Sequence, residues 1–161
     1  MTIHWQWQSF GDLSSLEMHA IFAARQAVFI VEQDCPYLDM DGKDLKADHL
    51  TAWSGTEVAA YLRLLGPGIS YPDEPSLGRI LTTRIGRGSG LGRELVARGL
   101  QRLHELYPTL PTRIGAQAHL QKFYGSFGFV PSSEPYDEDG IMHIEMMRPP
   151  GPVSIGRRLP G

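Results

Sequence analysis

The sequence predicts one α/β (α+β) domain with a mixed sheet and helices packed on it. Its length of 161 residues is typical of a single domain that buries its own core. Its composition, with 42% hydrophobic and 20% charged residues, is that of an ordinary globular protein. Segments that alternate apolar and polar residues occur between segments with helical spacing, and this order of strands and helices gives the fold class. We expect the domain to span residues 1–148.

The first 48 residues are expected to form a strand, a long helix and a loop. Residues 3–8 alternate apolar and polar side chains, as a strand with one buried face does. Ser14 and Glu17 then match a capping box, and apolar residues follow at helical spacing to about Glu32. Residues 32–48 break this spacing with a proline, a glycine and five aspartates, which predicts a loop.

The rest of the domain is expected to contain strands and helices joined by short loops. The predicted elements, in chain order, are a hairpin over 49–66 that turns at Gly55-Thr56, a strand over 76–83, an amphipathic helix over 91–107, a strand over 112–118, a short helix within 119–129, and a final pair of strands over 129–133 and 141–147. Residues 149–161 are rich in proline and glycine, which predicts a flexible tail.

Charge, cysteine content and hydropathy disfavour several classes of protein. The net charge of −3 gives no general attraction to nucleic acid or to an anionic membrane, so neither partner is expected. Cys35 is the only cysteine, which excludes an intrachain disulfide and fits a reducing compartment. The N-terminus is too polar for a signal peptide and no apolar run reaches transmembrane length, so a cytoplasmic location is expected. The metal motifs CxxC and HExxH are absent, and no metal is expected.

The stretch RIGRGSGLGRELVARGL (84–100) places four glycines at alternate positions directly before a predicted helix. Backbone amides at the start of a helix, with the helix dipole behind them, form a site for an anion. A Walker A loop requires Lys and then Ser or Thr after its last glycine, but Leu91 and Arg93 follow the last two glycines here. A Rossmann fingerprint requires GxGxxG, but counted from Gly86 or Gly88 the sixth position is again Leu91 or Arg93.

Two motifs of the chain are similar to motifs of the GNAT superfamily, the Gcn5-related N-acetyltransferases. Arg87-x-x-Gly90-x-Gly92, between a predicted strand and a predicted helix, resembles the GNAT loop that binds the pyrophosphate of acetyl-CoA. The segment QAHLQKFYGSFGF (117–129) resembles the later GNAT motif N-x-x-A-x-x-[FL]-Y-x-x-x-G-F. A glycine-rich turn that caps a helix would explain the first motif alone, but the second motif at the expected distance favours the GNAT interpretation.

The resemblance runs from about Trp5 to Met147 and is closest to the ElaA family within GNAT. The segments that carry it are VFIVEQDCPYLDMDG, GAQAHLQKFYGSFGF and YDEDGIMHIEM. Gln117 replaces the Asn usual in the superfamily and Leu120 replaces the usual Ala, and both replacements are in keeping with ElaA-type sequences. The resemblance implies the GNAT acyl-CoA N-acyltransferase fold, in which a mixed, mostly antiparallel central sheet is flanked by helices.

The resemblance also implies a reaction, in which an amine attacks the thioester of acetyl-CoA directly in a ternary complex. Amides of the glycine loop would receive the pyrophosphate, and Arg87 and Arg93 would add positive charge. The pantetheine arm would pair with the preceding strand, and Gln117 would either bond its amides or only cap a strand. The residues expected to bind acetyl-CoA are Leu81, Thr82, Thr83, Arg87, Gly88, Ser89, Gly90, Leu91, Gly92, Arg93, Gln117 and Tyr124.

Two groups are expected to assist the transfer. A backbone amide, taken to be that of Thr82, would polarise the thioester carbonyl. Tyr124 would act as the general acid that protonates the leaving thiolate. The alternative for Tyr124 is a role in core packing, because Phe123, Phe127 and Phe129 are close in sequence.

The general base is less well defined by the sequence. The strand before the glycine loop reads RILTT and carries no carboxylate, although some GNAT enzymes place one there. The candidates are therefore Glu32, Asp41, His49, His119 or an ordered water. Histidine titrates in the right range for a base, but a structural role is the alternative for each of the two histidines.

The acidic segment after the first helix suggests an acceptor class. In GNAT proteins this segment usually helps to form the acceptor pocket, so Glu32, Asp39 and Asp41 are expected to hold a cationic amine such as a polyamine or a lysine side chain. The alternative is a solvated acidic loop. A covalent route through Cys35 is not favoured, because nothing in the sequence places a base beside it.

The leading interpretation is an acetyl-CoA-dependent N-acetyltransferase acting on a small amine, a polyamine, or a lysine or N-terminal amine. One alternative is a non-catalytic sensor that binds acyl-CoA, and another is an acyltransferase that uses a different acyl group or an oxygen acceptor. Tyr124 in the expected motif favours catalysis, whereas the missing strand carboxylate argues mildly against it. GNAT domains are often homodimers, but no segment of this sequence identifies an interface.

Overall fold

The computed structural model describes residues 2–153. The strands are β1 (His4–Ser9), β2 (Asp48–Ser54), β3 (Glu57–Leu65), β4 (Ser76–Thr82), β5 (Thr112–Gln117), β6 (Val130–Pro131), β7 (Tyr136–Glu138) and β8 (Ile141–Arg148). The helices are α1 (Ser15–Arg25), α2 (Leu91–Leu106) and α3 (Gln121–Gly125), with a π-helical segment η2 (Gln26–Glu32) and 3₁₀ turns η1 (Phe10–Asp12), η3 (Gly42–Lys46), η4 (Arg84–Gly86) and η5 (Ala118–Leu120). Each helix and strand expected from the sequence is present in this list.

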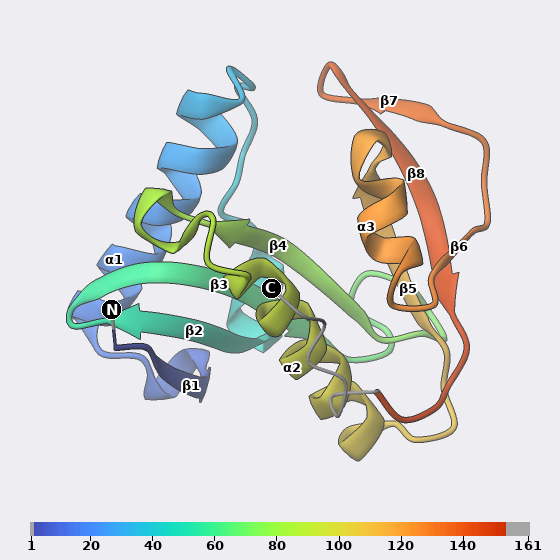
Figure 1. Ribbon diagram of the computed structural model, residues 1–161, viewed down its shortest axis with the longest axis horizontal. Coiled ribbons are helices and arrows are strands. Elements are labelled where there is room, and N and C mark those ends of the chain that lie inside the picture. The colour runs from blue at the N-terminus through green and yellow to red at the C-terminus, as the bar shows by residue number, and fades with distance from the viewer. Residues whose placement is uncertain (1, 154–161) are drawn as a thin grey trace.

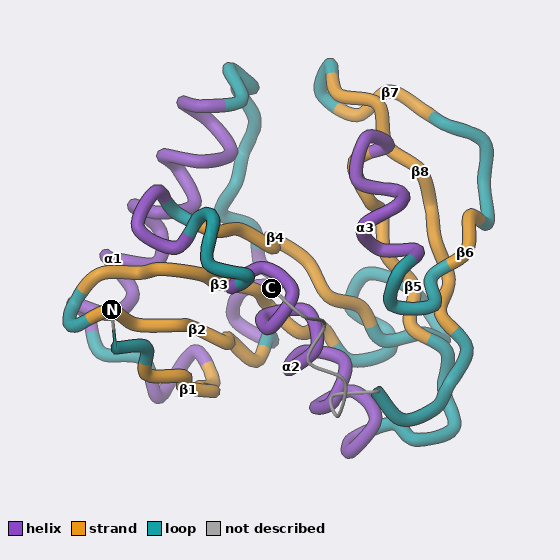
Figure 2. The backbone as a smooth tube through the Cα atoms, viewed as in Figure 1, coloured by secondary structure: helices purple, strands orange, loops and turns teal. Residues whose placement is uncertain are grey.

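The strands form two antiparallel sheets rather than one continuous sheet. The first has the order β1-β2-β3-β4, and the second has the order β5-β8-β6 with β7 also paired to β8. The two sheets meet where β4 and β5 begin, because the Arg113 amide donates to the Pro75 carbonyl at 3.1 Å. Figure 2 shows β4 and β5 separating from this point toward their other ends. The predicted α/β class with mostly antiparallel strands is confirmed. The sequence did not show that the strands divide into two sheets between β4 and β5.

The helices α1 and α2 cover opposite faces of the first sheet (Figure 1). Leu62 of β3 packs with Leu95 of α2 in the larger core cluster, whereas the neighbouring Tyr61 packs with Ile21 of α1 in the smaller one. All residues of β3 after Glu57 are buried, because both faces of this strand are covered.

The first helix begins and ends where the sequence predicts, but its last part has a different geometry. Ser14 and Glu17 form the predicted capping box, with bonds of 3.1 and 2.9 Å. Residues 26–32 are π-helical, and the Cys35 amide donates to the Ile30 carbonyl at 3.1 Å, five residues back. Local widening of this kind is frequent at functional sites.

Two features near the C-terminus were not predicted. The turn-rich segment EPYDEDG contains strand β7, in which Tyr136 pairs with His143 of β8. The first residues of the predicted flexible tail are held, because the Arg148 guanidinium donates to the Gly151 and Pro152 carbonyls at 3.3 and 3.2 Å. The rest of that tail, residues 154–161, lies outside the described residues. No helix within residues 2–153 has the length and apolar character needed to cross a membrane.

Candidate active site

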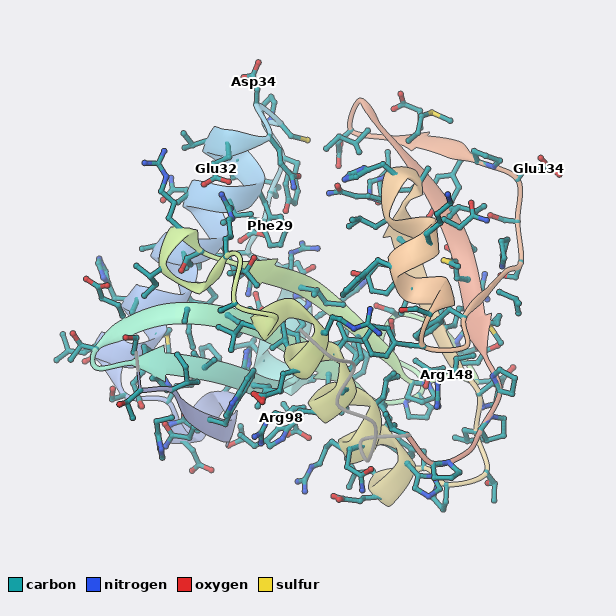
Figure 3. All side chains as sticks on the ribbon, in the orientation of Figure 1. Phe29, Glu32, Asp34, Arg98, Glu134 and Arg148 are labelled. Atoms are coloured by element: carbon teal, nitrogen blue, oxygen red, sulfur yellow. The ribbon has the colours of Figure 1, made fainter. Side chains whose placement is uncertain are left out.

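A cavity of about 720 Å³ lies where β4 and β5 separate, and this volume is typical of a site for a small-molecule ligand. All seven residues of β4 line it, together with residues 114–117 of β5. Phe29 of η2, which is labelled in Figure 3, lines the cavity on one side, and the β7–β8 hairpin lines it on the opposite side. The cavity therefore extends along the unpaired edges of two strands, and its walls come from segments far apart in the sequence.

The glycine loop follows β4, and its residue Arg87 lines the cavity. A Cβ on Gly86 would lie 2.2 Å from the Ala59 carbonyl oxygen, so only glycine fits against β3 there. Gly88 and Gly90 have φ values of +78° and +75°, which other residues rarely adopt. Within residues 2–153, the amides of residues 88–93 donate to no other protein group. Because they stand at the start of the 16-residue helix α2, they form a site for an anion.

Two arginines lie beside these amides. Arg87 Nη2 donates to Glu32 Oε2 at 2.7 Å and to the Thr82 carbonyl at 3.2 Å. Arg93 Nη1 donates to Ser126 Oγ at 3.0 Å, and its guanidinium lies 4.7 Å from the centre of the Phe127 ring. Both cations are thus held close to the loop, as phosphate recognition requires.

The edge of β4 that faces β5 has free backbone groups. The Thr83 amide donates to the Ala59 carbonyl at 3.0 Å, which makes this a hydrogen-bonded pair of the β3–β4 ladder. Hydrogen-bonded and non-bonded pairs alternate in an antiparallel ladder, so the amide of Thr82 points away from β3 and toward the cavity. By the same alternation, the amide of Ile80 also points away from β3 and toward the cavity. Directly before it, Arg79 with φ +50° forms a β-bulge that bends the strand.

Tyr124 lines the cavity from α3 and is both a packing residue and a candidate acid. Its ring packs edge-on against Phe123 and Phe129, with ring centres 5.1 and 6.1 Å away. Only 6% of the residue is exposed, and burial raises the pKa of its hydroxyl to about 12. The hydroxyl bonds to no other group within residues 2–153, so it is available to a ligand in the cavity.

The candidate bases lie in different places. His119 lines the cavity together with Tyr124 and Gln117, and the side chain of Gln117 donates to Gln33 Oε1 at 3.2 Å. Glu32 lies outside this cavity, at the end of η2, where it pairs with a loop arginine (Figure 3).

The prediction of His49 as a candidate base is wrong. It is fully buried, with Nδ1 2.6 Å from the Tyr61 hydroxyl and Nε2 3.0 Å from the Asp44 carbonyl. Burial lowers the pKa of its ring, and both nitrogens already have partners. The sequence suggested a base because His49 opens a strand next to an acidic loop, but its side chain points into the core.

The prediction that Asp39 and Asp41 of the acidic segment hold a cationic amine is also wrong, because arginines pair with both carboxylates. Asp39 Oδ2 lies 2.9 Å from Arg25 Nε, and Asp39 Oδ1 lies 2.8 Å from Arg79 Nε. Asp41 receives two bonds from Arg63, at 2.7 and 3.0 Å, and it is the one of these two aspartates that lines the cavity. Neither carboxylate is free to hold a cationic amine. The arginines come from α1, β3 and β4, so sequence proximity could not reveal the pairing.

A polar cluster that sequence reasoning missed lies near the point where the sheets meet. Glu145 of β8 accepts a bond from the Tyr71 hydroxyl at 3.0 Å and another from Arg113 Nε at 3.3 Å, both at Oε2. The Tyr136 hydroxyl donates to Oε1 at 3.3 Å. Gly115 lies beneath this cluster, because a Cβ there would be 3.1 Å from the Tyr136 hydroxyl.

His143 is a further cavity residue that sequence reasoning missed. Its Nδ1 is 2.8 Å from the Ile141 carbonyl, and its Nε2 is 3.3 Å from Glu138 Oε2. In the strand sequence IMHIEMM it is separated by one residue from Glu145, and the residues between and after them, Ile144 and Met146, are buried. That alternation could have placed His143 and Glu145 on one face, but only the pairing with β5 and β7 shows that this face lines the cavity.

Comparison with known proteins identifies the family. A family model described as an acetyltransferase (GNAT) domain matches residues 24–148, which is most of the chain. The chain belongs to the GNAT acetyltransferase family. Among its relatives, a UPF0039 protein from Synechocystis is 48% identical over 91% of this chain and 96% of its own length. Protein ElaA of Escherichia coli is 43% identical over the same shares of the two chains.

Two solved structures give the same result. An acyl-CoA N-acyltransferase from Pseudomonas aeruginosa matches with a TM-score of 0.86 and 42% identity, covering 91% of this chain and 99% of that chain. The crystal structure of Escherichia coli ElaA matches with a TM-score of 0.85 and 40% identity over the same shares. The resemblance to GNAT and ElaA proteins, and the fold that it implied, are confirmed.

The GNAT fold binds acyl-CoA, and the residues of this GNAT domain fit that ligand. The free amides of residues 88–93 match a pyrophosphate, and the side-chain-free Gly86 lets the loop lie flat against β3. The free edge of β4 offers backbone bonds to the amides of a pantetheine arm. In the part of the chain that the structure describes, no group of three or more His, Cys, Asp or Glu residues could hold a metal ion.

Proposed function

We propose that the protein transfers an acetyl group from acetyl-CoA directly to an amine in a ternary complex. The observation that carries the proposal is that Arg87 of the glycine loop, the free edge of β4 and Tyr124 all line one cavity, and that the free amides of residues 88–93 directly follow Arg87. This order matches a ligand with a pyrophosphate at one end, an amide-containing arm and a reactive group at the other. The cytoplasmic location and the homodimer expected from the sequence stay predictions.

Binding is assigned to the loop and to β4. The amides of residues 88–93 hold the pyrophosphate, and Arg87 and Arg93 supply the charge. The pantetheine arm pairs with the free backbone amides of β4, those of Thr82 and Ile80, and Gln117 donates to it from β5. The amides of Leu81 and Thr83, also expected from the sequence, face β3 instead. Most of these contacts come from the backbone, so the site depends on strand and loop geometry more than on side-chain identity.

Catalysis is assigned to a backbone amide and to Tyr124. The cosubstrate supplies a thioester, and the amide of Thr82 or of Ile80 donates to its carbonyl oxygen as negative charge develops there. As the nitrogen–carbon bond forms and the carbon–sulfur bond breaks, Tyr124 gives its proton to the sulfur. A base takes the proton that the amine loses, and His119, His143 or an ordered water can reach the cavity for this step.

Direct transfer is favoured over a covalent route by the state of Cys35. Its Sγ donates to the Asp139 carbonyl at 3.1 Å. Burial and the nearby aspartates raise the pKa of this thiol, which disfavours the thiolate form that acts as a nucleophile.

The test is release of CoA thiol from acetyl-CoA in the presence of a panel of amines, with wild type and Tyr124→Phe compared. We expect amine-dependent release that falls about 100-fold to 10,000-fold in kcat in the variant, with little change in the KM for acetyl-CoA. Tyr107→Phe is the control, because Tyr107 lies off the cavity at the end of α2. Release with longer acyl-CoA only would reassign the acyl group. Binding of acetyl-CoA without release from any amine would contradict catalysis and support a sensor.

A further inference from the structure

Arg63 of β3 lies in the cavity wall with one donor unpaired. Its side chain is 4% exposed, and its Nη1 lies 2.7 Å from Asp41 Oδ1 and 2.9 Å from Asp44 Oδ1. Within residues 2–153, its Nε has no hydrogen-bond partner. A buried N–H group without an acceptor is unfavourable, so this donor favours the binding of an acceptor atom, from a water molecule or a ligand, in the cavity.

Gly78 leaves the space that such an acceptor atom would need. It is the register partner of Arg63 on β4, and both residues line the cavity. A Cβ at Gly78 would lie 3.8 Å from Arg63 Nε, and no other group would be nearer. Gly78 is not among the glycines with positive φ, so its backbone does not demand glycine. What the missing side chain provides is open volume next to the free N–H.

The neighbouring polar groups of the cavity also present donors rather than free carboxylates. Lys43 Nζ donates to Ser70 Oγ at 3.0 Å, and within the described residues it has no carboxylate partner. Asp41 is occupied by Arg63, and Glu145 accepts bonds from the Tyr71 hydroxyl and from Arg113. This part of the cavity is therefore suited to an anionic oxygen and not to a second ammonium group.

The position of these donors fixes how far that oxygen lies from the reacting amine. Gly78 precedes Ile80 by two residues, which corresponds to about 7 Å along a strand. We take the Ile80 amide, the nearer of the two amides assigned to the acyl carbonyl, as the one that receives it, so the amine must arrive next to Ile80. An acceptor bound at Arg63 must then carry its anionic group within a few bonds of its amine.

We infer that the acceptor is a free amino acid, whose carboxylate binds Arg63 Nε and Lys43 while its amine faces the acyl group. The inference rests on the proposed function, because it names the acceptor class for the same cavity. It also replaces the polyamine expected from the acidic loop, whose aspartates are paired with arginines.

The experiment compares matched acceptors at saturating acetyl-CoA. Phenylalanine, phenylalaninamide and phenethylamine form one set, and lysine, lysinamide and cadaverine form another. Because the amide has a less basic α-amine than the amino acid and the decarboxylated amine has a more basic one, basicity alone cannot favour the amino acid over both. We expect kcat/KM for the amino acid to exceed both others by about 10-fold to 100-fold, as for a hydrogen bond to a charged group.

Gly78→Ala tests the subsite without disturbing the buried arginine. The added methyl group makes an ordinary contact at 3.8 Å and occupies the space beside Nε. We expect the KM for the amino acid to rise about tenfold, with the KM for acetyl-CoA and for phenethylamine unchanged. Gly11→Ala is the matched control, because a Cβ there meets nothing within 4 Å. Lys43→Gln should lower the same preference.

Calorimetric titration of the amino acid into protein saturated with CoA gives a second readout that needs no turnover. Binding that Gly78→Ala weakens, without thiol release from any acceptor, would support the subsite and contradict the proposed transfer. Thiol release with no preference for the carboxylate, or a preference that Gly78→Ala leaves intact, would overturn the inference and leave the transfer in place.

Discussion

At the scale of single residues, the burial of Tyr124 determines the pH at which it can act as an acid. The residue is 6% exposed, and burial raises the pKa of its hydroxyl to about 12. An acid is active below its pKa, so this raised value keeps Tyr124 protonated through neutral and mildly basic pH. We expect kcat to show no decline between pH 7 and about pH 10, because Tyr124 keeps its proton over this range. A pH–rate profile with a falling limb near pH 8 that Tyr124→Phe abolishes would contradict this assignment.

Residues with local constraints were predicted from the sequence, and residues with distant partners were not. The glycine loop was predicted because its function depends on the backbone of consecutive residues, and Gly86 and Gly90 have the close approach and positive φ that glycine permits. The acidic loop was misinterpreted because the partner of Asp41 is Arg63, 22 residues away and on another element. Charge counted along a sequence does not show which carboxylates are already paired.

At the scale of elements, one ion pair connects the end of η2 to the glycine loop. Arg87 Nη2 lies 2.7 Å from Glu32 Oε2, and both side chains are partly exposed at 44% and 34%. The Glu32 carboxylate competes with a pyrophosphate for the Arg87 guanidinium, and its negative charge repels the pyrophosphate. Glu32→Gln should therefore lower the Kd for acetyl-CoA, by at most about fivefold because exposed pairs are weak. Titration calorimetry at low and high salt measures this, with Glu105→Gln on the distal end of α2 as control. Weaker binding in Glu32→Gln would mean instead that Glu32 positions Arg87.

The predicted boundaries of helices and strands agree with the structure where the hydrophobic periodicity is regular. They differ from it where pairing with another strand determines the structure. The helix to Glu32 was predicted from apolar spacing, but a spacing pattern does not distinguish the π-helical geometry of residues 26–32, whose bonds span five residues. Strand β7 was missed because EPYDEDG has the composition of a turn. Its pairing with the neighbouring β8 makes it a strand.

At the scale of the whole molecule, buried ion pairs connect the first helix, the acidic segment and the central sheet. Arg25 of α1 is completely buried and pairs with Asp39 and Asp44. Asp44 also pairs with Arg63 of β3, which forms part of the cavity wall. These contacts fix the acidic segment against the sheet, so the shape of the cavity depends on them. Such an arrangement is sensitive to the loss of any one partner, because the remaining charges stay buried.

Asp44 gives this dependence a measurable pH signature. Burial alone would raise the pKa of its carboxyl, but the hydrogen bonds and charges of Arg25 and Arg63 outweigh that effect and lower it. A lowered folded pKa contributes stability that is complete above the unfolded value, about 3.9, and is lost as the pH falls through the folded value. Asp44→Asn should cost about 3 to 5 kcal/mol of unfolding free energy at pH 7, because two buried arginines lose a shared partner. Below pH 4 the wild type should lose stability more steeply than the variant, so their urea unfolding curves should converge.

Asp12→Asn, at an exposed position, is the control and should change stability by less than about 0.5 kcal/mol. Equal pH slopes for wild type and Asp44→Asn would show that Asp44 does not carry this part of the acid sensitivity.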